Sequence, residues 1–138
     1  MHDPRHIDVF FYGLFMDADA LRARGFNPIN PRLGRVNNYA LRIGQRATLV
    51  PSVGAEAYGF VMSLTHADID RLYTDESVSV YRPDPVSVEL TDTSSIPALC
   101  FNLPTAPSPG EANAAYAAKL GALCRRLGLP AAYVASIA

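Results

Sequence analysis

Residues 7–15 read Ile-Asp-Val-Phe-Phe-Tyr-Gly-Leu-Phe and combine the clearest strand of the chain with the turn that ends it. Apolar, β-branched and aromatic residues dominate the run from Ile7 to Tyr12, which is typical of a buried strand. Gly13 then permits a sharp turn and the close approach of a ligand. Backbone N–H groups that point outward after such a turn can hold a carboxylate. An ordinary strand-to-helix connection fits the same pattern, and both interpretations stay open.

Two short helices carry local start signals. Asp17 is suited to cap a helix that runs through residue 24, and Gly25 is suited to end it. Thr65 opens a second helix, because Asp68 three residues later completes a capping-box arrangement. Ile69 and Leu72 give this helix a buried stripe, and we expect it to end near Tyr73.

The segment between these helices predicts two strands and two connections. Residues 27–31 contain two prolines and two asparagines, so we expect a connecting loop there. Residues 39–43 and 57–62 have the composition of strands. Pro51, Ser52 and Gly54 predict a turn or loop between them.

The second half of the chain predicts a hairpin followed by helices. Residues 86–90 alternate between apolar and polar side chains, as in a half-buried strand, and residues 98–103 form a more buried neighbour. Ser108, Pro109 and Glu111 suit the N-cap, first-turn and N3 positions of a helix. The helix that follows is ended by Gly128 and leads to a shorter helix from Pro130. The apolar residues at helical spacing in the first of these helices are Tyr116, Leu120, Leu123, Cys124 and Leu127.

This order of elements predicts an α+β fold with a mostly antiparallel sheet or small β-barrel. The length of 138 residues fits a single domain over residues 1–138. Cys100 and Cys124 lie in apolar patterns, so we expect them to be buried and reduced. Residues 1–8 resemble no signal peptide and no apolar run reaches the length of a membrane span, so we expect a cytoplasmic protein without membrane contact.

Charge is balanced overall but uneven along the chain. The net charge of −1 argues against a general nucleic-acid-binding protein, which usually has a basic face. Six arginines, however, occur between Asp19 and Glu56 with no acid among them. They could attract an anionic ligand or an acidic protein partner, or they could pair with acids elsewhere in the chain. The six arginines are Arg22, Arg24, Arg32, Arg35, Arg42 and Arg46.

Motifs for cofactors and covalent catalysis are missing. The sequence has no glycine-rich phosphate loop and no nucleophile elbow. His2, His6 and His66 have no cysteine or carboxylate at ligand spacing, so we expect neither a metal nor a cofactor. Nothing in the sequence defines the oligomeric state.

Two acids follow the second predicted helix, in Thr74-Asp75-Glu76-Ser77. Acids at a helix C-terminus oppose the helix dipole, so their position does not serve helix stability. Asp75 and Glu76 are either solvated loop carboxylates or part of a functional site.

Four segments together resemble the gamma-glutamylcyclotransferase superfamily, which includes the AIG2-like proteins and the gamma-glutamylamine cyclotransferases. They occur in the order of that family and span nearly the whole chain. The segments are Phe11-Tyr12-Gly13 with Met16 and Leu21; Pro51, Gly54, Ala57 and Gly59; residues 72–76 with Tyr81-Arg82 and residues 86–88; and Pro109, Tyr116, Gly121 and Gly128-Leu129-Pro130 with Tyr133.

The resemblance implies a small β-barrel with one cavity and a small-molecule gamma-glutamyl substrate, which the enzyme cyclises to 5-oxoproline while it releases an amine or amino acid. It places the catalytic general acid/base on Glu76. It places the turn that binds the substrate carboxylate on Tyr12, Gly13, Leu14 and Phe15. Tyr81 and Tyr116 are candidates for the pocket wall, although both could equally pack in the core.

Three positions depart from the family pattern. Leu14 stands where the family usually has serine, Tyr73 where it often has aspartate, and Ser77 where glycine normally follows the glutamate. A backbone N–H site tolerates Leu14, because every non-proline residue supplies that donor. A protein of the same fold that binds a gamma-glutamyl ligand without turnover therefore stays an alternative, as does an interaction module.

Overall fold

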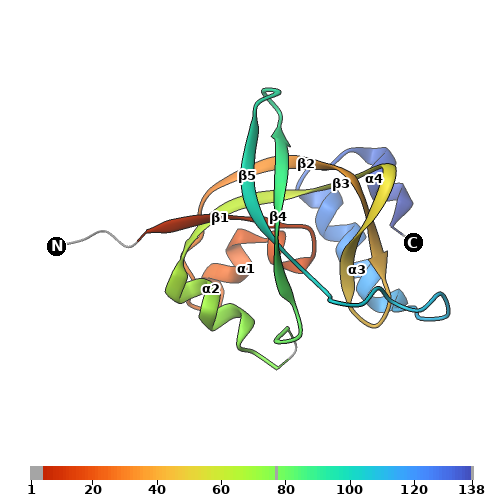
Figure 1. The fold of residues 1–138 in the computed structure, drawn as a ribbon, viewed down its shortest axis with the longest axis horizontal. Coiled ribbons are helices and arrows are strands. Elements are labelled where there is room, and N and C mark those ends of the chain that lie inside the picture. The colour runs from red at the N-terminus through yellow and green to blue at the C-terminus, as the bar shows by residue number, and fades with distance from the viewer. Residues whose placement is uncertain (1–4, 77, 138) are drawn as a thin grey trace.

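Five strands close into a β-barrel in the computed structural model, which describes residues 5–76 and 78–137. Their order around the barrel is β1-β3-β2-β4-β5, and all neighbours are antiparallel except β1 and β5, which pair in parallel at Val9 and Leu99. The predicted α+β class with a mostly antiparallel barrel is confirmed (Figure 1). The strands are β1 (His6–Phe11), β2 (Ile29–Ile43), β3 (Ala47–Thr65), β4 (Arg82–Leu90) and β5 (Ser95–Asn102).

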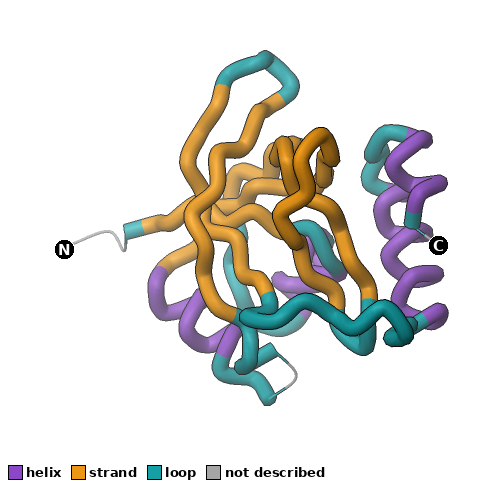
Figure 2. Tube along the Cα trace, turned by 45° about the vertical axis from the view of Figure 1, so that its right-hand side comes forward, coloured by secondary structure: helices purple, strands orange, loops and turns teal. Residues whose placement is uncertain are grey.

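Helices cover two sides of this barrel. Figures 1 and 2 show α3 and α4 beside each other on one side and α2 on another. A single 3-10 turn, η1, connects β1 to α1. The helical elements are η1 (Leu14–Met16), α1 (Ala18–Ala23), α2 (His66–Tyr73), α3 (Ala114–Arg126) and α4 (Ala131–Ser136). None of the helices in the described ranges is long and apolar enough to cross a membrane.

The caps predicted for the first two helices are present. The Asp17 carboxylate accepts hydrogen bonds from the backbone N–H groups of Asp19 and Ala20, at 3.1 and 3.3 Å. The Thr65 hydroxyl accepts one from the Asp68 N–H at 3.1 Å. Such caps satisfy N–H groups that have no partner inside the helix, and each stabilises a helix by about 1 kcal/mol.

The second half of strand β1, from Val9 onward, is apolar because both of its faces are buried. Val9 and Phe11 pack in the cluster between the barrel and the helices, together with Leu120 of α3. Phe10 and Tyr12 point the other way, into a second cluster with Val61 that fills the barrel. A strand with two buried faces has no polar alternation, which is why residues 9–12 read as a continuous apolar run.

The prediction of a turn at residues 51–54 is wrong, and so is the prediction of a connecting loop over residues 27–31. Strand β2 already begins at Ile29, and β3 runs without interruption through Pro51 and Gly54. The glycine and proline mark an irregularity in the β2–β3 pairing instead: Asn38 and Gly54 both have positive φ, and the Gly54 N–H donates to the Asn38 side chain at 3.0 Å. Bulges use the same residue types as turns, so the local signal is ambiguous.

The predicted helix start at Ser108 is also wrong. Helix α3 begins at Ala114 behind an Asn113 cap. The Glu111 carboxylate does accept the Ser108 N–H, at 2.6 Å, but it also accepts the Gln45 N–H, at 3.5 Å. Asn113 donates to the Gln45 carbonyl at 3.2 Å. Contacts with the turn between β2 and β3 therefore hold this segment, and the N-cap is Asn113, five residues after the predicted Ser108.

Most of the arginine-rich segment forms ion pairs within the chain, as one of its interpretations predicted. Arg32 contacts Asp8 at 2.9 Å, and Arg35 contacts both Glu56 and Glu89. These internal pairs leave the proposal of an acidic protein partner without specific support. Arg22 pairs with Asp19 at 3.2 Å and Arg24 with Asp75 at 4.0 Å. Cys100 and Cys124 are buried and form no disulfide, as expected.

Candidate functional site

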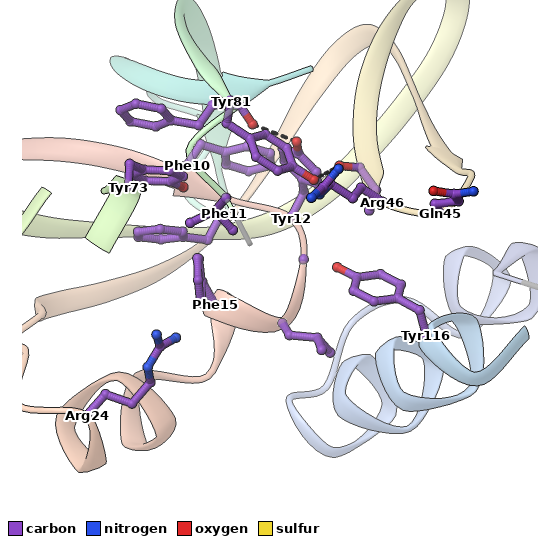
Figure 3. A pocket seen from close by; sticks show the side chains of 15 residues that line it. Phe10, Phe11, Tyr12, Phe15, Arg24, Gln45, Arg46, Tyr73, Tyr81 and Tyr116 are labelled. Atoms are coloured by element: carbon purple, nitrogen blue, oxygen red, sulfur yellow. Dashed lines mark hydrogen bonds between the residues drawn. The ribbon is translucent and has the colours of Figure 1, made fainter. Parts of the chain in front are cut away.

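A cavity of about 360 Å³ opens at the end of the barrel where β1 and β5 finish and β3 begins (Figure 3). Its volume falls within the ~300–1,000 Å³ usual for ligand sites. Six of the seven residues predicted for the site line it. They are Tyr12, Gly13, Leu14 and Phe15 from the β1–α1 connection, Tyr81 from the loop just before β4, and Tyr116 from α3.

The Tyr-Gly turn folds as the single 3-10 turn η1, in which the Met16 N–H donates to the Gly13 carbonyl at 3.0 Å. Gly13 has an extended backbone, with φ of −107°, so its conformation does not itself require glycine. Space does. A Cβ atom on Gly13 would lie 2.6 Å from the Tyr116 hydroxyl oxygen. The Leu14 backbone N–H donates to the Tyr116 hydroxyl oxygen, so α3 and the turn form one wall of the cavity.

This contact predicts the behaviour of a substitution at Gly13. Gly13→Ala should lower the free energy of unfolding by about 1–3 kcal/mol, because the new methyl group overlaps the Tyr116 hydroxyl. Tyr116→Phe should rescue it, since the next ring atom lies 4.0 Å away. Urea unfolding of both single variants and the double variant measures the coupling, and strictly additive losses would contradict the contact.

Three of the tyrosine hydroxyl groups belong to predicted residues of the cavity wall, and two of them are hydrogen-bonded to main-chain carbonyls. Tyr12 donates to the Phe101 carbonyl at 2.6 Å, and Tyr81 donates to the Ala47 carbonyl. Burial raises the pKa of Tyr81 to about 12, and it raises the pKa of Tyr12 and Tyr116 above their usual value. These phenols are therefore protonated at neutral pH, so they can donate hydrogen bonds but cannot act as bases.

Stacked aromatic rings form the rear of the cavity. Tyr73 stacks on Phe101 with ring centroids 3.9 Å apart, and Phe15 meets Tyr73 edge-to-face at 6.2 Å. The Arg24 guanidinium lies over the Phe15 ring, 5.5 Å from its centroid, while it also contacts Asp75. Tyr73 thus replaces the aspartate of the family pattern with an aromatic packing residue.

Glu76 is the predicted site residue that the structure does not place on the cavity wall. Its side chain is exposed, and it is not among the described residues that line the cavity. It belongs to the loop between α2 and β4, which contributes Val78 and Tyr81 to that wall. Hydrogen bonds from the Val78 N–H to the Asp75 carbonyl and from the Tyr81 N–H to the Val78 carbonyl shape this loop. Ser77 lies outside the described residues.

Nine further lining residues were missed by sequence reasoning. Arg24 and Arg46 belong to the arginine-rich segment, which did signal an anionic ligand. Phe11 and Tyr73 fall within the segments that resemble the family but were not predicted for the wall. The rest gave no signal, because their role depends on how the barrel closes. Besides the two arginines, the missed residues are the aromatic residues Phe10, Phe11, Tyr73 and Phe101, and the residues Gln45, Ala47 and Val78. Within residues 5–76 and 78–137, no group of three metal-ligating side chains is suited to hold a metal ion.

Comparison with known proteins identifies the fold. Neither a scan against protein-family models nor a search of curated proteins found a match to this sequence. A solved gamma-glutamyl cyclotransferase structure matches with a TM-score of 0.77 and 19% identity, over 96% of this chain and 86% of the other. An uncharacterized protein from Homo sapiens matches with a TM-score of 0.74 and 20% identity, over 96% of this chain and 86% of the other.

A gamma-glutamyl cyclotransferase specific to glutathione, from yeast, has a TM-score of 0.67 and 12% identity, over 98% of this chain and 94% of the other. At such low identities the likeness concerns the fold. Because it extends over nearly the whole chain, it concerns the barrel together with its helices. The chain therefore has the gamma-glutamyl cyclotransferase fold that its sequence resembles.

Proposed function

We propose that this protein cyclises the gamma-glutamyl group of a small molecule to 5-oxoproline and releases an amine or amino acid. One observation carries the proposal: in a chain with this fold, the Tyr12–Phe15 turn, Tyr81 and Tyr116 all line the same cavity. The structures named as gamma-glutamyl cyclotransferases support the activity, and the cavity supports a small-molecule substrate.

The reaction needs little chemistry from the protein. The alpha-amine of the substrate attacks its own gamma-carbonyl carbon, a C–N bond closes the five-membered ring, and the bond to the leaving nitrogen breaks. Holding both reacting groups of one molecule in this geometry can supply effective molarities of about 10⁵ M or more. The aromatic walls formed by Phe11, Phe15 and Tyr73 suit that role because they restrict how the substrate folds.

The substrate carboxylate is proposed to bind at the Tyr-Gly turn. Backbone N–H groups at the start of a helical turn have no acceptor within it, which favours an anion there. The Leu14 N–H already points at the Tyr116 hydroxyl oxygen, so a bound anion would share this donor with Tyr116. The Tyr116 hydroxyl, which already contacts the Leu14 backbone, is placed to donate a further hydrogen bond. Leu14 is compatible with this site because the interaction uses main-chain groups.

Proton transfer is assigned to Glu76. The ammonium must lose a proton before attack, and the leaving nitrogen must gain one. The cavity wall in the described ranges contains tyrosines and arginines but no carboxylate or imidazole, so it offers no base of its own. Glu76 is the family's acid by resemblance, and it follows Asp75, whose carboxylate contacts the wall residue Arg24.

A second candidate function has specific support. Because the Glu76 side chain is exposed and lies outside the cavity wall, the protein could bind a gamma-glutamyl ligand without converting it. Turnover separates the two candidates. Purified protein should release 5-oxoproline from gamma-glutamyl amino acids or gamma-glutamyl amines, detected by mass spectrometry. Saturable binding of the same compounds without 5-oxoproline would replace the first candidate with the second.

A further inference from the structure

Apolar side chains make up most of the cavity wall. Of the fifteen residues that line the cavity, eight are aromatic and three are aliphatic. Leu14, Phe15, Tyr73 and Val78 are only partly buried, so water still reaches them. Covering apolar surface with an apolar ligand releases this water and stabilises the complex. The composition of the wall therefore favours a ligand with a large apolar part.

The gamma-glutamyl unit itself does not supply such a part. It carries an amine, a carboxylate and an amide, and its carboxylate is proposed to bind at the turn next to Tyr116. Figure 3 shows Tyr116 on one side of the view and Phe15 and Tyr73 on the other. The region around Phe15 and Tyr73 is therefore available to the rest of the ligand, which is the leaving group.

An ordered group of rings lines this region. Tyr73 stacks on Phe101 with an interplanar angle of 13°, and Phe15 meets Tyr73 edge-on at 85°. Val78 comes from the loop after α2, whose Tyr81 ring lies 6.4 Å from that of Tyr73 between centroids. Aromatic groups prefer stacked or edge-to-face contacts, and rings already held by one another lose little freedom when a ligand packs on them. We refer to Phe15, Tyr73, Val78 and Phe101 as the aromatic subsite.

Several polar groups near this subsite are already engaged. Tyr12 and Tyr81 donate their hydroxyl hydrogens to main-chain carbonyls. Arg24 lies over the Phe15 ring, 5.5 Å from its centroid, and faces Asp75 at 4.0 Å. A polar leaving group would give up its bonds to water without gaining these groups as new partners, which costs free energy. An apolar leaving group has no such bonds to lose.

We propose that the aromatic subsite binds an aromatic leaving group, so that gamma-glutamyl compounds of aromatic amino acids or amines are the preferred substrates. The inference rests on the proposed function for the gamma-glutamyl end of the ligand. Val78 and Glu76 belong to the same loop between α2 and β4. A leaving group held against Val78 therefore lies beside the segment that carries the acid assigned to protonate its nitrogen.

The test compares gamma-glutamyl-phenylalanine with gamma-glutamyl-alanine, which carry the same charges and differ by one phenyl group. Wild-type protein should prefer the phenylalanine compound by about tenfold or more in kcat/KM, as expected when an aromatic ring is removed from water. Phe15→Ala and Val78→Asn should each bring this ratio closer to one. Val53→Asn is the matched control, since Val53 is 98% exposed and lies outside the cavity, and it should keep the wild-type ratio.

Calorimetric dissociation constants for the same two compounds make the inference independent of turnover. If neither compound is converted, a binding preference that Val78→Asn and Phe15→Ala reduce supports the aromatic subsite although the proposed activity fails. Equal values for the two compounds in wild type, or a preference that survives in both variants, overturn the inference, while any release of 5-oxoproline still supports the activity. Absence of binding by both compounds also overturns the inference, and other gamma-glutamyl compounds then test the activity separately.

Discussion

Glu76→Gln is expected to lower the rate of 5-oxoproline release by about 10²- to 10⁴-fold, the usual contribution of a general acid/base group. The change preserves size and hydrogen bonding but removes the ability to accept a proton. Ligand affinity should change little, because Glu76 is not part of the described cavity wall. Stopped assays for 5-oxoproline give kcat, and calorimetry gives the dissociation constant.

Asp70→Asn is the matched control for this variant. Asp70 is an exposed acid of α2, only six residues before Glu76, and it lies outside the cavity. The Asp70→Asn variant should retain full activity. Full activity of Glu76→Gln would contradict the assignment of proton transfer to Glu76 and would require a base from the substrate or solvent.

Gly59→Ala is expected to destabilise the protein by about 2–4 kcal/mol, at or above the upper end for overpacking of a core. A Cβ atom on Gly59 would overlap the Phe11 carbonyl oxygen of the neighbouring strand and lie 3.0 Å from the Phe10 ring. Phe11 is the last residue of β1 and lines the cavity. Ligand affinity should therefore fall together with stability.

Gly121→Ala, the same chemical change at another position, is expected to stabilise the protein. Gly121 lies inside α3, and a Cβ atom there would meet nothing within 4 Å. Because alanine favours a helix over glycine, the variant should gain about 0.5–1 kcal/mol. Urea unfolding curves measure both variants. Similar effects at the two positions would contradict the close packing of β1 against β3.

Sequence reasoning succeeded where the signal is local. The caps at Asp17 and Thr65 are formed by neighbouring residues, so each helix start is contained in a few positions. The periodic apolar residues of α3 and the alternation in β4 likewise reflect one buried face each. The fold class followed from the order of these elements.

Predictions from the sequence were wrong or incomplete where contacts between residues far apart in the chain determine the structure. Ser108 and Glu111 form the local hydrogen bond of a helix start, yet bonds between Glu111 and Gln45 keep that segment out of the helix. The same turn brings Arg46 to the cavity, a placement that exists only after β2 and β3 pair. The exposure of Glu76 is equally a property of the folded loop.

An NMR titration of the labelled protein with 5-oxoproline tests most directly whether the cavity beside the Tyr-Gly turn holds the gamma-glutamyl-derived ring. Binding there should shift the backbone amide signals of Gly13, Leu14 and Phe15 in a saturable way. The second cavity, of about 350 Å³ between the β2–β3 pair and α4, serves as an internal comparison. Shifts confined to its residues Leu41, Ile43 and Ser136, or no shifts at all, would contradict the placement of the site.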